Sequence, residues 1–167
     1  LIGPYDNGEP HYLEYVVSIM KLAGIDGVII DMPGITEVYD YDLLLDHTNA
    51  LIPYLEKAGL KFAICYEDNL LKVGLSQGKF KSMIDEGKRV MTYFNQNYFS
   101  KENYFKINNI PVLLNFGPQS LKSDEEWNYV FSPLKDVLFF PLSFHAQYFN
   151  LKSSVDGAFA WVDESGD

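Results

Sequence analysis

The stretch Gly24-Ile25-Asp26-Gly27-Val28-Ile29-Ile30-Asp31-Met32-Pro33-Gly34 decides the fold class of this chain. Its apolar, β-branched run 25–30 predicts a short strand buried on both faces, as in parallel sheets covered by helices. Gly24 is placed to end a preceding helix, and Pro33-Gly34 turns the chain after the strand. Asp31 therefore lies at the strand's carboxyl end, where α/β folds place their chemistry.

A second strand of the same kind is predicted over 61–67, where the sequence reads Lys-Phe-Ala-Ile-Cys-Tyr-Glu and is followed by Asp68. Carboxylates thus follow two successive strands. Neighbouring parallel strands lie about 4.8 Å apart, so Asp31 and Glu67 are expected near each other, in reach of the separation found in retaining glycosidases.

Helical patterns alternate with these strands. A stripe at i, i+3, i+4 and i+7 predicts a helix from Pro10 to Gly24, and Ser123 with Glu126 forms a capping box for a late helix. Pro53 is expected to kink or divide the helix predicted over 43–58. The remaining predictions are a loop at 68–76, a helix at 78–97, a short strand and turn at 104–111, and strands at 112–116, 137–142 and 156–162.

This alternation predicts a parallel sheet built from βα units in one α/β domain, residues 1–167. Two closures remain open: a five-stranded open doubly wound sheet, or part of a (β/α)8 barrel, which needs about 250 residues. The periodicity alone favours the open sheet, because five strands suit a chain of 167 residues.

The composition of the chain limits the classes of ligand and partner that it is expected to bind. The net charge of −10 argues against nucleic acid and anionic membrane surfaces as partners. No apolar run approaches the roughly 20 residues of a membrane span, so no membrane insertion is expected. The sequence contains no P-loop, GxGxxG or HExxH, so neither a cofactor nor a metal is predicted. The single cysteine, Cys65, lies in an apolar strand and is interpreted as a small buried hydrophobe.

Together with the segments at 1–6, 62–68, 106–114 and 156–161, the opening stretch resembles glycoside hydrolases of families 71 and 99, the second of which includes the endo-acting α-mannosidases. The resemblance implies a TIM-type (β/α)8 barrel of which this chain supplies roughly strands 2 to 6, so that the chain is a fragment. It also implies an α-linked, mannan-like oligosaccharide or polysaccharide as partner and a secreted or periplasmic location. The oligomeric state stays open.

Family 99 carries a catalytic Glu-x-x-Glu pair on a late strand, and no such pair occurs among these residues, so the catalytic residues are not assigned. The alternatives are a glycoside hydrolase and a non-catalytic carbohydrate-binding relative. The candidate sugar-binding residues end strands or follow them, although Asp68 could instead cap a loop and Tyr66 could pack behind the barrel. They are Asp31, Glu67, Asp68, Tyr66, Tyr5, Asp6, His145 and Trp161.

Overall fold

The structure, a computed structural model, describes residues 6–39, 41–143, 151 and 153–161. No helix in these ranges is both long enough and apolar enough to cross a membrane. In chain order the elements are α1 (Pro10–Leu22), β1 (Gly27–Met32), α2 (Tyr41–Ala58), β2 (Lys61–Tyr66), α3 (Leu70–Ser76), α4 (Met83–Phe94), a π-helical turn (Asn95–Phe99), β3 (Lys106–Ile107), β4 (Ile110–Asn115), α5 (Asp124–Phe131) and β5 (Leu138–Pro141).

The helix ends follow local chemistry. α1 begins with Pro10 at its first position, and the Glu9 side chain accepts a hydrogen bond from the Tyr12 backbone at 2.7 Å. It ends at Leu22, and Gly24 just beyond the C-cap has a φ of +77°, the left-handed conformation that a glycine adopts without steric cost. At α5 both halves of the predicted capping box are present: the Ser123 hydroxyl accepts from the Glu126 backbone, and the Glu126 carboxylate accepts from the Ser123 backbone.

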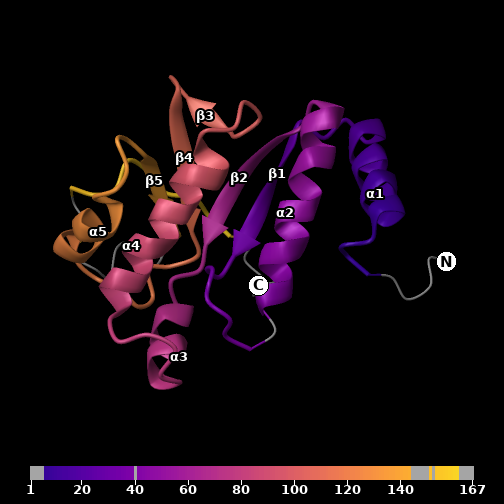
Figure 1. Ribbon diagram of the computed structural model, residues 1–167. Helices are drawn as coiled ribbons and strands as arrows, with labels where there is room; N and C mark the ends of the chain where they lie inside the picture. The colour runs from indigo at the N-terminus through magenta and orange to yellow at the C-terminus, as the bar shows by residue number, and fades with distance from the viewer. Residues whose placement is uncertain (1–5, 40, 144–150, 152, 162–167) are drawn as a thin grey trace, which may run out of the picture.

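The strands lie in one sheet whose order follows the chain. β1 pairs with β2, β2 with β4, and β4 with β5, all in parallel (Figure 1). Leu142 then forms a parallel bridge to Phe159, so the order continues in the same direction. β3 is only the antiparallel arm of a hairpin with β4, turned by Asn108 and Asn109 at positive φ.

The two faces of the sheet differ. Alternate strand residues such as Met32, Ile64 and Phe139 pack with residues of all five helices in the main core. The other face, the inner face, carries a small cluster of Ala63, Cys65, Val112 and Leu114, packed only against strand and loop residues among those described. Helices on one face and a strand order without reversal are features of barrel winding, whereas a doubly wound sheet reverses its order and has helices on both faces.

Three expectations from the sequence are wrong in detail, and one alternative of a fourth is excluded. β1 is not buried on both faces: Ile29 on the inner face is 63% exposed, because β1 is the edge strand of the described sheet and no helix covers that face. The stretch 68–76 contains a short helix, α3, rather than a loop alone. Pro53 does not divide α2, which is one helix from Tyr41 to Ala58, and the alternative of a kink at Pro53 stays a prediction. The predicted strand 156–162 is reduced, in its described part, to the single bridge at Phe159.

Candidate functional site

The alternation of β1 and β2 places two predicted site residues on the inner face. Asp31 pairs in register with Cys65, and the Glu67 backbone donates to the Met32 carbonyl at 3.0 Å, so β2 continues beside β1 for one residue more. Side chains two residues apart share a face, so Cys65 and Glu67 lie on the same side as Asp31. The structure thus brings Asp31 and Glu67 together at the carboxyl ends of adjacent strands.

The interaction of the Asp31 side chain with Glu67 favours the protonated form of Glu67. Partial burial, together with the side-chain interaction and the charge of Asp31, raises the pKa of Glu67 to about 7. A hydrogen bond from the Asn69 side chain opposes the shift, and the charge of Asp68 adds to it. At neutral pH Glu67 is therefore about half protonated, and its protonated form offers a hydrogen-bond donor at the end of β2.

The pair lies on one face of the sheet, at the ends of adjacent strands. Retaining glycosidases separate their two carboxyl groups by about 5–5.5 Å, because the sugar reacts between them. Such a separation stays a prediction for Asp31 and Glu67. Two carboxyl groups on one face can also bind and orient the same ligand from one side.

Cys65 lies directly below the pair. Burial raises the pKa of its thiol to about 12, and the charges of Asp31 and Glu67 contribute to the rise. The thiol is therefore protonated and unreactive at neutral pH. This confirms the interpretation of Cys65 as a small buried hydrophobe, at 2% exposure.

Asp68 has a structural role, which corrects its assignment as a sugar ligand. The residue is fully buried, and its carboxylate accepts hydrogen bonds from the backbones of Gln119, Ser120 and Leu121 at 2.5 to 3.0 Å. The Asn115 side chain adds a fourth donor at 3.3 Å. Asp68 therefore ties the loop after β2 to the loop after β4 and has no surface left for a ligand.

Tyr66 is likewise removed from the site. Its ring is fully buried in the main core, edge-on to Phe94 of α4 with ring centroids 6.0 Å apart. It has the parity of Phe62 and Ile64, on the helix-facing side of β2, so it packs behind the sheet. The alternative that the sequence left open for Tyr66 is the one observed.

The remaining candidate sugar-binding residues do not all lie beside the carboxyl pair. Asp6 is exposed and pairs with His47 of α2, with Oδ1 and Nε2 3.2 Å apart, which makes it a partner of α2 rather than of the carboxyl pair. Tyr5 and His145 lie outside the described residues. Trp161 is half-exposed two residues after Phe159, so it shares the inner face by parity.

Phe116 is a site residue that sequence reasoning missed. It directly follows β4, it packs against the inner-face cluster, and its ring meets that of Trp161 edge-on with centroids 5.1 Å apart. The strand-end rule that selected Asp31 and Glu67 applies equally to the end of β4. Applied there, it would have found Phe116.

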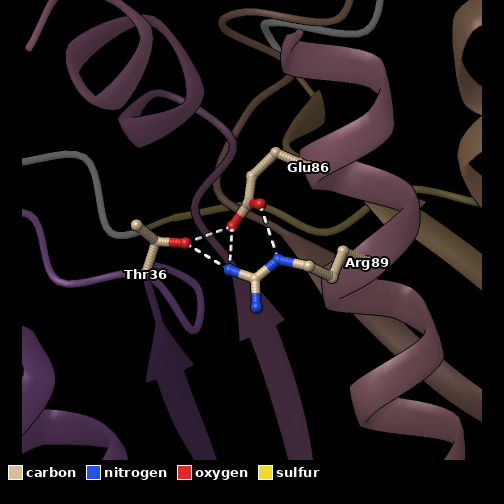
Figure 2. A network of polar contacts seen from close by, with 3 residues as sticks. All are labelled: Thr36, Glu86 and Arg89. Carbon is tan, nitrogen blue, oxygen red and sulfur yellow. Dashed lines mark hydrogen bonds and ion pairs between the residues drawn. The ribbon is translucent and has the colours of Figure 1, made fainter. Parts of the chain in front are cut away.

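A buried polar network fixes the loop that follows Asp31 (Figure 2). Glu86 in the first turn of α4 accepts two hydrogen bonds from Arg89, both at 2.8 Å, although its side chain is only 6% exposed. The Thr36 hydroxyl donates to Glu86 and accepts from Arg89. Thr36 belongs to the β1–α2 loop, so the network anchors that loop to α4 at the end of the sheet that carries the carboxyl pair.

Within the described ranges, no cluster of three or more His, Cys, Asp or Glu side chains has an arrangement that could hold a metal ion. The described side chains of the site offer the carboxyl groups of Asp31 and Glu67 and, farther along the same face, the rings of Phe116 and Trp161.

Comparison with known proteins identifies the fold. No protein-family model and no curated protein sequence matches this chain. Among solved structures, a protein described as glycoside hydrolase-like matches with a TM-score of 0.62 and 12% identity, over 84% of this chain and 45% of its own. A GH99 endo-α-mannosidase from Bacteroides thetaiotaomicron matches with a TM-score of 0.63 and 14% identity, over 97% of this chain and 46% of its own.

This chain has the fold of half a glycoside hydrolase barrel. A second structure of the same Bacteroides enzyme, in complex with bis-tris-propane, gives a TM-score of 0.63 and 15% identity over 98% of this chain and 49% of its own. The chain spans about half the length of these structures, as expected of a fragment. At this level of identity the likeness establishes the fold and not the activity. The barrel-type fold is confirmed, with an open parallel sheet that corresponds to about half of such a barrel, and the doubly wound alternative is wrong.

Proposed function

We propose that this chain forms the sugar-binding part of a glycoside hydrolase that acts on an α-linked, mannan-like glycan. The observation that carries the proposal is the carboxyl pair of Asp31 and Glu67 at the carboxyl ends of adjacent barrel strands, the place where barrel enzymes hold their substrates. The likeness to structures of an endo-α-mannosidase supports the choice of ligand.

In this proposal the pair binds sugar hydroxyl groups. The neutral carboxyl donates one hydrogen bond and the carboxylate accepts another, so two neighbouring hydroxyls of one ring satisfy both groups. The pair is not assigned the bond-breaking step, because its two groups stand on the same side of the ligand. A non-catalytic carbohydrate-binding relative remains the second candidate, favoured by the lack of a Glu-x-x-Glu motif in these 167 residues.

The test is binding and hydrolysis of α-mannotetraose and maltotetraose, with Asp31→Asn as the site variant. We expect Asp31→Asn to raise the Kd of the better ligand about tenfold, because it removes a charged hydrogen-bond acceptor. Asp26→Asn is the matched control at the opposite end of β1 and should leave the Kd unchanged. Release of reducing ends supports the hydrolase, and binding without hydrolysis supports the binding relative. Equal effects of the two variants would count against the proposed site.

We propose further that residues 1–167 form one domain that supplies strands 2 to 6 of the barrel and that additional strands cover its inner face. That face holds an apolar hollow of about 400 Å³, lined by side chains that include Ile29, Ala63 and Phe140. In a complete barrel such side chains meet layers from the facing strands. The secreted or periplasmic location stays a prediction from the family resemblance.

The substitution Ile29→Lys is expected to have different effects in the isolated chain and in a complete barrel. In the 167-residue chain alone, we expect the substitution to reduce aggregation, because Ile29 is 63% exposed on an edge strand. In a polypeptide that includes the remaining strands, it should cost about 2–4 kcal/mol, because it buries a lysine in an apolar layer. Ile19→Lys on α1, at 47% exposure, is the control and should be mild in both. Light scattering and denaturant unfolding measure these effects, and a mild effect of Ile29→Lys in the longer polypeptide would contradict the covered face.

A further inference from the structure

Two aromatic rings stand together at the end of the sheet that carries the carboxyl pair. Trp161 is 52% exposed, and the partly buried Phe116 meets it edge-on, with an angle of 80° between the ring planes. Phe116 follows β4 directly, and Trp161 follows the segment that extends the sheet beyond β5. A half-exposed tryptophan supported by a second ring presents a large apolar surface with one polar N–H group, which suits a ligand with both apolar and hydroxyl-bearing sides.

The rings and the carboxyl pair share one face. Phe116 packs with Cys65 on the inner face, and the Cys65 thiol lies within electrostatic reach of both Asp31 and Glu67. β4 is the direct neighbour of β2, so Phe116 is one strand spacing, about 4.8 Å, from the strand that carries Glu67. Trp161 lies farther along the sheet, beyond β5. The aromatic rings and the carboxyl pair are therefore adjacent but do not coincide.

We propose that Phe116 and Trp161 form a stacking subsite for a neutral sugar ring, next to the ring whose hydroxyls bind Asp31 and Glu67. The inference rests on the proposed function and adds that the ligand is a neutral oligosaccharide of at least two units. A pyranose ring has an apolar face of C–H groups, which packs on an aromatic ring while its hydroxyls stay at the edge. The acidic pair disfavours uronic acids and other anionic sugars, because like charges repel.

Calorimetric titration of the full-length protein tests this subsite with α-mannotetraose, maltotetraose and methyl α-mannoside. Trp161→Ala should raise the Kd of the better tetrasaccharide about tenfold, close to the effect of removing a stacked aromatic ring in other ligand sites. It should change the Kd of the monosaccharide less than about twofold, because one sugar unit uses the carboxyl pair alone. Phe116→Leu should act in the same direction and more weakly, since a leucine retains part of the support for Trp161.

Tyr15→Ala on α1 is the control, since Tyr15 is also half-exposed, at 50%, but lies away from the inner face. An optical readout is independent of affinity: the tetrasaccharide should shield Trp161 from acrylamide quenching, and that change should be missing in Trp161→Phe. Tetragalacturonate should not bind.

The outcomes separate the two proposals. If the wild-type protein binds a tetrasaccharide and Trp161→Ala binds it equally well, the stacking subsite is wrong and the proposed function stands. Equal losses for the tetrasaccharide and the monosaccharide would also overturn a separate subsite. If the wild-type protein binds none of the neutral sugars, both proposals fail together.

Discussion

Replacing Asp68 with alanine is expected to lower the free energy of unfolding by at least about 3 kcal/mol. Hydrogen bonds to charged groups are each worth about 1.5–3 kcal/mol, and this buried carboxylate accepts from three backbone N–H groups and one side-chain amide. The contributions of one network do not add, so the total stays below their sum. The alanine also leaves those backbone donors buried without an acceptor.

Urea unfolding, followed by circular dichroism, measures this loss. For a chain of this size a loss of 3 kcal/mol corresponds to a fall in Tm of about 6–12 °C. Asp68→Asn retains one acceptor oxygen, so it should fall between the wild type and Asp68→Ala and remains measurable if the alanine variant does not fold. Asp46→Ala on the exposed side of α2 is the control and should stay within about 0.5 kcal/mol.

Asp68 also decides between two roles for a strand-end carboxylate. If Asp68 were a sugar ligand, its substitution would weaken sugar binding and leave the Tm unchanged. If Asp68 instead holds two loops together, its substitution lowers the Tm and leaves sugar binding unchanged. The structure requires the second role, because a Cβ added to Gly117 would lie 2.2 Å from Asp68 Oδ1. Even the backbone of the β4–α5 loop is therefore packed against this carboxylate, and Gly117→Ala should destabilise the same connection.

The sequence patterns located the strands and their ends because both depend on local chemistry. A short apolar run closed by a turn defines β1 and β2, and a glycine with positive φ follows the end of α1 where the pattern of apolar residues stops. The capping box at Ser123 and Glu126 is equally local and was predicted correctly. α3 was missed because seven residues are too few to show an amphipathic repeat.

Burial and side-chain direction could not be predicted in the same way, because they depend on what lies across the sheet. The run 25–30 looks buried on both faces, yet Ile29 is exposed, because helices cover only the other face. At the end of β2, Tyr66, Glu67 and Asp68 all follow the strand-end rule, but only Glu67 has the parity of the inner face. Once the positions of the helices are known, the alternation of side chains along the strand is enough to place Glu67 on the inner face and its two neighbours on the other face.

The proton of Glu67 leads to the second large effect, a change in sugar affinity with pH. Below a pH of about 7 the Glu67 carboxyl is neutral and donates to a sugar oxygen, and above it Glu67 is ionised and loses that donor. The affinity of the wild-type protein should therefore fall about tenfold as the pH rises from 6 to 8. Glu67→Gln retains an N–H donor and does not titrate, so its affinity should be nearly constant over this range, whereas Glu67→Ala should bind weakly throughout. Glu125→Gln on the exposed side of α5 should follow the wild-type curve.

The same proton makes the stability of the fold depend on pH, and that dependence does not require a ligand. Unfolded, Glu67 ionises near its ordinary pKa of 4.5, whereas in the folded chain it keeps its proton to about 7. The folded state then binds more protons than the unfolded state between these values, so ionisation of Glu67 makes the free energy of unfolding fall as the pH rises through this window. Glu67→Gln removes that contribution, so its stability relative to the wild type should increase between pH 4.5 and 7 and then level off. A constant difference between the two proteins across the window would show that the pKa of Glu67 is not raised in the folded chain. Affinity that follows pH without the matching stability change would instead assign the titration to another group of the protein, because the neutral sugars do not titrate in this range.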